Sequence, residues 1–165
     1  MNRPATAWRG VALAVALLAC LGGLVGGCGD RPGVRLLVDE RARAPLEEAA
    51  NLFEMRTGHR VRRTYASARR LQTLLFTGSH DLVVADHAQL AEHPVTSAFD
   101  PETERILGSS REGVVLGSML RRTSMGRAEP RGLWLFLQEA EARAMLDAAG
   151  IRLAPDAPTG GKERP

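Results

Sequence analysis

The feature that most constrains the fold is an alternation of short apolar segments with helical segments between residues 34 and 86. Residues 34–38, 60–65 and 81–86 have the length of strands, and the last is apolar through its middle, as expected of a strand buried on both faces. The two segments between them carry apolar residues at helical spacing. Strands joined through helices form parallel sheets with right-handed crossovers, so this order predicts an open α/β fold.

Both connecting helices have recognisable ends. Pro45 suits the first turn of a helix, and Gly58 is expected to cap the end of that helix in the left-handed conformation. Ser67 is expected at the N-cap of the second helix, which ends at Gly78. The segment 60–65 is rich in arginine, so we expect it at an edge of the sheet, where one side contacts water.

The second half of the chain is predicted to complete the same domain. Residues 100–108 have the signature of a short helix, residues 113–120 that of a fourth strand, and residues 129–150 that of one long helix. The expected buried stripe of the long helix is Leu133, Phe136, Leu137, Ala140, Ala144 and Ala148. The prediction is one α/β domain over residues 34–154, with an open, mostly parallel sheet of about four strands flanked by helices.

The first 27 residues are predicted to be an export signal. Arg3 and Arg9 precede a run of apolar and glycine residues, the arrangement typical of such signals. The tetrad at residues 25–28, Val-Gly-Gly-Cys, resembles a bacterial lipobox, which implies that Cys28 is acylated and becomes the first residue of the mature protein. We therefore expect an exported protein that a lipid anchors to the outer face of the bacterial cell membrane or within the periplasm. Residues 28–33 would be the acylated cysteine and a short tether.

Two alternatives stay open for this segment. Residues 10–27 could remain in place as a membrane-spanning anchor, although four glycines weaken a spanning helix. Cys20 is a second candidate for acylation, but the bulky Leu18 stands shortly before it. In each case the basic residues stay on the cytoplasmic side and the remainder of the chain is exported.

The charge of the chain argues against nucleic acid as a partner. The chain has 22 lysine and arginine residues and 19 aspartate and glutamate residues, and removal of the signal leaves 20 basic residues against 19. A nearly neutral exported domain lacks the positive field that holds phosphate backbones. Acylation of Cys28 would leave no pair of cysteines for a disulfide, so stability must come from burial. Residues 155–165 are predicted to be a disordered tail.

The order of these segments resembles the periplasmic solute-binding proteins of ABC importers, most closely the molybdate-binding branch. The landmarks are Phe-Glu-Met-Arg-Thr-Gly at residues 53–58, a strand followed by a serine, and an Asp-apolar-Ala-Asp strand at residues 81–86. The resemblance covers residues 34–93 and 113–154. It implies capture of a small oxyanion such as molybdate or tungstate, delivery to an ABC permease, and no cofactor.

The resemblance also implies an oxyanion site at the start of the second helix. Ser67 matches the family's serine at this place, and with the backbone N–H groups of Ala68 and Arg69 it is the candidate contact for the oxyanion. The plainer alternative, that Ser67 only caps its helix, stays open; such a cap is worth about 1 kcal/mol.

At the end of the first strand the family pattern is not matched. Asp39 and Glu40 stand where the family has a small residue and serine. Two acids repel an anion unless Arg41 and Arg43 dominate the local field, so Arg41 is included among the candidate ligand-binding residues.

The chain is too short for the second lobe of the family. Between His93 and Gly113 there are only about twenty residues, where a lobe of roughly a hundred would be inserted. A single lobe covers one side of a ligand, whereas solute sites enclose most of the ligand surface. Two functions are therefore considered: a solute-binding lipoprotein of an ABC importer, or a shortened relative that serves as an interaction or structural module.

Other constellations are weaker. The acids and histidines His80, Asp81, Asp86, His87 and His93 suggest a metal site, but the strand between His80 and Asp86 separates them by roughly 20 Å. An Asp86 and His87 pair is only half a site, so no metal is expected. No G-x-S-x-G phrase surrounds a serine, so catalysis is not expected either.

Overall fold

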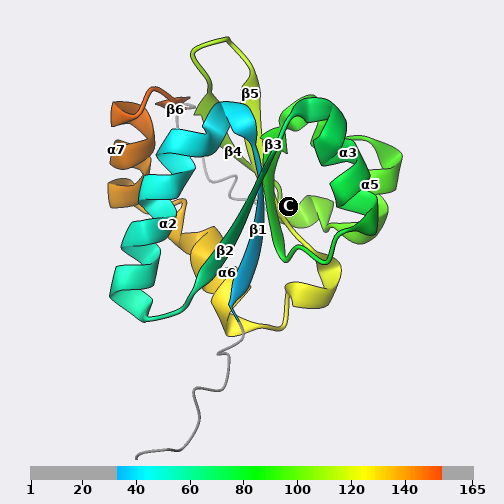
Figure 1. Ribbon diagram of the computed structural model, residues 1–165, viewed down its shortest axis with the longest axis horizontal. Helices are drawn as coiled ribbons and strands as arrows, with labels where there is room; N and C mark the ends of the chain where they lie inside the picture. Colours follow the sequence, from blue (N-terminus) through cyan, green and yellow to red (C-terminus); the bar gives the residue numbers. More distant parts are fainter. Residues whose placement is uncertain (1–32, 154–165) are drawn as a thin grey trace, which may run out of the picture. The chain divides into compact units, whose positions relative to one another are not determined.

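The computed structural model describes residues 33–153, and the predicted export signal, Cys20, Cys28 and the predicted tail lie outside these residues. Its six strands form one sheet in the order β2-β1-β3-β5-β4-β6 (Figure 1). The strands are β1 Val34–Asp39, β2 Val61–Ala66, β3 Leu82–Asp86, β4 Arg105–Ser109, β5 Val115–Leu120 and β6 Arg152–Leu153.

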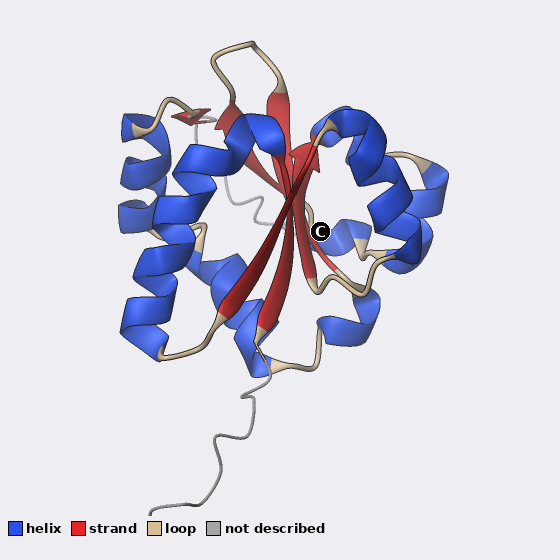
Figure 2. Cartoon of the chain, in the orientation of Figure 1, coloured by secondary structure: helices blue, strands red, loops and turns tan. Residues whose placement is uncertain are grey.

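Helices cover both faces of the sheet (Figures 1 and 2). The helices are α2 Arg43–Thr57, α3 Ala68–Thr77, α4 His87–Leu90, α5 His93–Ala98, α6 Ala128–Phe136 and α7 Ala140–Ala148. Three short 3-10 helices, η1 Glu40–Ala42, η2 Pro101–Thr103 and η3 Arg122–Ser124, join other elements. Helices α2, α6 and α7 pack on one face, and α3, α4 and α5 pack on the other. Within residues 33–153 none of the helices has the length and apolar character needed to cross a membrane.

The first half of the sheet forms as the sequence predicts. Strand β1 pairs in parallel with β2 on one side and β3 on the other. The arginine-rich β2 is an edge strand, and the middle of β3 is fully buried. Gly58 caps α2 with a left-handed φ of 70°. The predicted α/β class is confirmed.

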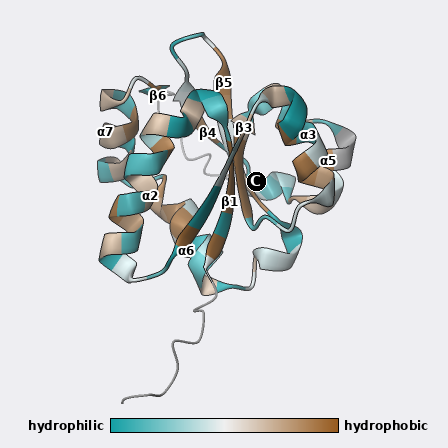
Figure 3. Ribbon diagram, in the orientation of Figure 1, coloured by the Kyte–Doolittle hydropathy of each residue, from teal (hydrophilic) through white to brown (hydrophobic). Residues whose placement is uncertain are grey.

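Two hydrophobic layers hold the domain together, one on each face of the sheet. Figure 3 shows apolar residues on the central strands and at intervals along the helices that flank them. In the larger layer the rings of Phe53 on α2 and Phe136 on α6 lie 5.7 Å apart between centroids. The smaller layer contains Leu71 on α3, Leu90 on α4 and Phe99 after α5, all fully buried.

The second half of the sheet differs from the expectation in strand number and direction. The sheet has six strands rather than four, and β5 pairs antiparallel with β3 and β4, as β6 does with β4. The helix expected at residues 100–108 is only the single turn η2, which Asp100 caps by accepting from the Glu102 N–H. The chain is then extended at Glu104 and enters β4, because hydrogen bonding to β5 outweighs the local helix signal.

The long helix expected at residues 129–150 is two helices. The chain leaves the helical conformation after Leu137, and Glu139, with a φ of −68° and a ψ of 149°, begins α7. Leu133, Phe136 and Leu137 are buried as predicted, but the predicted Ala140, Ala144 and Ala148 are exposed. Ala142 and Leu146 are buried instead, because the turn before α7 changes which residues of the following helix face the core.

A second lobe does not occur within residues 33–153. The residues between β3 and β5, where it would stand, form α4, α5, η2 and β4, and all of these belong to the same sheet or its helical layer. The described part of the chain is one lobe with one sheet.

Candidate functional site

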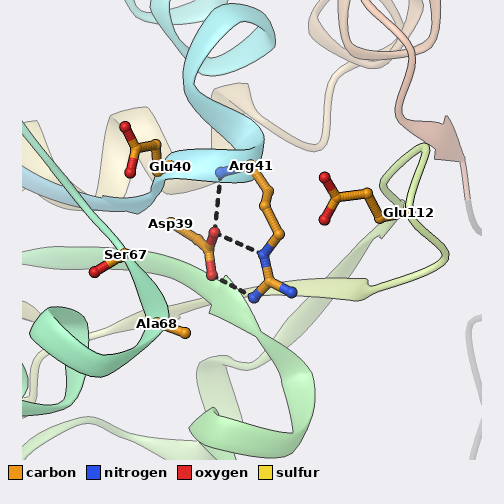
Figure 4. A pocket seen from close by; sticks show the side chains of 6 residues that line it. All are labelled: Asp39, Glu40, Arg41, Ser67, Ala68 and Glu112. Atoms are coloured by element: carbon orange, nitrogen blue, oxygen red, sulfur yellow. Dashed lines mark hydrogen bonds and ion pairs between the residues drawn. The ribbon is translucent and has the colours of Figure 1, made fainter.

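A pocket opens where β1 and β2 end (Figure 4). Parallel strands present their carboxyl ends at one edge of a sheet, and in open α/β sheets ligands bind outside that edge. The volume of about 470 Å³ suits a small solute. The residues that line the pocket are Asp39, Glu40, Arg41, Ser67, Ala68 and Glu112. Three of the four predicted ligand-binding residues, Arg41, Ser67 and Ala68, are therefore brought together.

Ser67 follows β2 and precedes α3, as predicted. Its backbone is extended, with a φ of −62° and a ψ of 157°, and its carbonyl accepts from the Leu71 N–H at 2.8 Å, so the helix begins at the next residue. Its hydroxyl makes no capping hydrogen bond. The first N–H groups of a helix have no partner within the helix, so Ala68 presents an amide beside this hydroxyl. Arg69 is exposed and does not line the pocket.

Asp39 and Arg41 form a tight pair at the end of β1. The Asp39 carboxylate accepts from the Arg41 backbone N–H at 3.0 Å and so caps η1. The Arg41 side chain donates to the same carboxylate through Nε at 2.9 Å and through Nη2 at 2.6 Å (Figure 4). The Asp39 side chain is 1% exposed and that of Arg41 is 25% exposed. The hydrogen bonds to Asp39 raise the pKa of the Arg41 guanidinium, against the lowering effect of burial.

The lining of the pocket carries more negative than positive charge. Among the described residues of the lining, Asp39, Glu40 and Glu112 are acids and Arg41 alone is basic. Its guanidinium also lies 3.9 Å from Asp86. Arg43, which was expected to help offset the acids, does not line the pocket: it pairs with Glu47 at 4.0 Å and lies over the Tyr65 ring.

Sequence reasoning missed Glu112. It lies in the loop between β4 and β5, and the antiparallel pairing of those strands carries that loop to the pocket. With a helix expected in place of β4, no hairpin was expected at these residues. The short stretch between residues 109 and 115, which ends in a glycine-containing turn before an apolar run, was the signal available.

Within residues 33–153 no three histidine, cysteine, aspartate or glutamate side chains lie close enough together to hold a metal ion. Asp81 accepts hydrogen bonds from Ser124 and Arg127. Asp86 caps α4, and His87 contacts Glu104 at 2.6 Å. The side chain of His93 lies outside the described part of the structure.

Comparison with known proteins finds similarity in structure alone. No family model matches the sequence, and no curated protein matches it. Among solved structures, the periplasmic molybdate-binding protein of Azotobacter vinelandii superposes with a TM-score of 0.65 at 10% identity, over 74% of this chain and 100% of the other. This chain has the fold of a periplasmic-binding-protein lobe.

Two further structures share that lobe. A substrate-binding domain from Clostridium difficile, described as belonging to a molybdenum ABC transporter, has a TM-score of 0.64 at 7% identity and covers 74% of this chain and 99% of its own. Iron-bound HitA from Pseudomonas aeruginosa has a TM-score of 0.51 at 10% identity, with 76% and 90% covered. The resemblance expected from the sequence is thus confirmed for the fold. The sequence identities are 7–10%, so the ligand contacts predicted for this chain stay predictions.

Proposed function

We propose that this chain is an extracytoplasmic solute-binding lipoprotein of an ABC importer, and that its solute is a small oxyanion such as molybdate or tungstate. The fold supports a solute-binding role. The single observation that carries the oxyanion proposal is that Ser67 lines the pocket at the start of α3 and that its hydroxyl makes no capping hydrogen bond. Hydroxyl and backbone N–H donors suit a weakly basic oxyanion.

The candidate contacts divide into free donors and engaged donors. Ser67 and the amide of Ala68 lie at the pocket with donors that the helix does not use. Arg41 is already hydrogen-bonded to Asp39. We therefore expect the oxyanion to contact the start of α3 first, with weak affinity, because one lobe leaves much of the ligand surface in water.

The test is thermal unfolding of the purified protein with sodium molybdate, tungstate, sulfate and phosphate. A ligand that binds only the folded state raises the melting temperature. We expect a rise with at least one oxyanion, and loss of that rise in Ser67→Ala. Thr73→Ala, which removes an exposed hydroxyl farther along α3, is the control and should keep the rise.

The second candidate function is an interaction or structural module. The negative balance of charge in the pocket and the engagement of Arg41 by Asp39 favour it. Unchanged melting with all four oxyanions, from a protein that unfolds cooperatively, would contradict oxyanion capture by this lobe and favour the module.

A further inference from the structure

The pocket already contains an anion, the carboxylate of Asp39. Both of its oxygens accept from Arg41, Oδ1 from the backbone N–H and from Nε, and Oδ2 from Nη2 (Figure 4). The Asp39 side chain is 1% exposed, so it cannot turn out into water without rearrangement of the end of β1.

A guanidinium and an adjacent backbone N–H are donors that an oxyanion uses when it binds a protein. In this pocket those donors belong to Arg41, which is the one basic side chain that residues 33–153 contribute to the lining. Because Asp39 accepts from both of them, a dissolved oxyanion must compete with a carboxylate that is held in place by the chain. The competition is intramolecular, so the carboxylate pays no entropy of association.

We propose that Asp39 is a specificity-determining residue, a built-in anion that withholds Arg41 from solute oxyanions and so lowers the affinity of this pocket for them. The proposal rests on the proposed function, since it assigns the same pocket to the solute. It assigns to Asp39 a role beyond capping η1.

The other acids in the pocket supply a matched comparison. Glu40 lines the pocket with the same charge as Asp39, but the hydrogen bonds of Arg41 go to Asp39. Glu40→Gln also removes one negative charge from the lining, so it measures how far a change of charge alone alters the affinity. Withholding of Arg41 makes Asp39→Asn much the stronger change, because only that substitution releases charge-assisted hydrogen bonds.

The experiment measures sodium molybdate and sodium sulfate affinity by calorimetric titration of the purified chain at constant ionic strength, with sodium chloride as the control for screening. The variants are Asp39→Asn, Glu40→Gln and the double variant Asp39→Asn with Arg41→Gln. Asparagine retains an oxygen that can accept from the Arg41 N–H, so the cap of η1 is kept. Asp39→Ser, which also caps, is the second variant if asparagine impairs folding, and circular dichroism verifies the fold of each.

We expect Asp39→Asn to raise oxyanion affinity about tenfold or more, the strength of one charge-assisted hydrogen bond. Glu40→Gln should raise it by much less, and the double variant should lose the gain. Equal gains in Asp39→Asn and Glu40→Gln, or a gain that persists without Arg41, would overturn the proposal.

Failure of the proposed function gives a different pattern. If the unsubstituted protein binds an oxyanion and Asp39→Asn binds it no better, the function stands and the role of Asp39 is refuted. If only Asp39→Asn binds, the role of Asp39 is supported and the natural pocket is not an oxyanion receptor. If neither binds, both proposals are refuted.

Discussion

Asp81 was considered as a metal ligand in the sequence, and in the structure it holds segments of the fold together. It precedes β3, its side chain is 1% exposed, and its carboxylate accepts from the Arg35 N–H at 2.9 Å, from Ser124 Oγ at 2.8 Å and from Arg127 Nη1 at 2.9 Å. Burial alone would raise its pKa, but the hydrogen bonds from Arg35 and Ser124 lower it below the ordinary value. Asp81 therefore joins β1, β3 and the segment before α6.

Asp81→Asn should destabilise the fold. Removal of one partner from buried hydrogen bonds costs about 1–3 kcal/mol, and the Arg35 and Arg127 side chains, 44% and 33% exposed, stay in contact with water. Glu47→Gln is the control, since the Arg43–Glu47 pair is exposed and such pairs contribute about 0.3–0.5 kcal/mol. Urea unfolding of both variants measures the difference, and a similar small loss in both would show that the network is not important for stability.

His80, next to Asp81, should make stability depend on pH. Burial, followed by the charges of Arg121 and Arg35, lowers the pKa of His80. The unfolded chain then binds a proton more readily than the folded chain. The contribution of His80 to the free energy of unfolding is therefore fully present above about pH 6.5 and is lost as the pH falls below that value. Urea unfolding at pH 7 and at pH 5.5 should show this loss, and His80→Gln should reduce it. An unchanged loss in the variant would assign it to other groups.

Ser67→Ala should change the stability of the ligand-free protein little. A serine that caps a helix contributes about 1 kcal/mol, but the Ser67 hydroxyl makes no capping hydrogen bond, so we expect a change within about 0.5 kcal/mol. A loss near the full value in urea unfolding would support the plainer interpretation of Ser67 as a cap.

At the scale of elements, the first half of the fold could be predicted because the periodicity and the capping residues of each segment agree with the structure that the segment adopts. Strands β1 to β3 and helices α2 and α3 show clear periodicity, and both helices end at a glycine. Strand β4 could not be predicted, because its place depends on pairing with β5 rather than on its own residues. The turn between α6 and α7 was missed because the apolar spacing continues across it.

The pairing of β4 with β6 depends on a glycine. A Cβ on Gly108 would lie 2.3 Å from the Arg152 carbonyl oxygen, and φ at this position is 153°. Gly108→Ala should therefore separate β6 from β4 and lower the melting temperature, because backbone cannot move aside as a flexible side chain can. Gly126→Ala is the matched control, since a Cβ there meets nothing within 4 Å. Equal melting temperatures would contradict the close packing of β6.

At the scale of the whole molecule, the sequence predicts the lobe and the edge at which a solute would bind, but only part of the lining. Asp39 is the last residue of β1, Arg41 follows it, and Ser67 and Ala68 follow β2, so strand order alone places these residues together. Glu112 depends on the hairpin, and the engagement of Arg41 by Asp39 depends on side-chain geometry. Neither follows from the spacing of residues along the chain.

Acylation at Cys28 is a prediction for the whole protein. In a bacterial host, Cys28→Ser should prevent incorporation of labelled fatty acid into the protein, because the thiol is the acceptor. Cys20→Ser is the control and should leave the incorporation unchanged. Labelling that persists in Cys28→Ser and is lost in Cys20→Ser would favour the Cys20 site.

Glu112 has a consequence for how this protein can change over time. It is exposed on the hairpin loop beside Gly113, which has a left-handed φ of 81°. A Cβ on Gly113 would meet nothing within 4 Å, so this end of the loop contributes little to the core. Surface substitutions of this kind seldom alter stability. A mutation at Glu112 can therefore reverse the charge of one wall of the pocket while the fold is conserved, so in evolution this charge can change without a loss of stability.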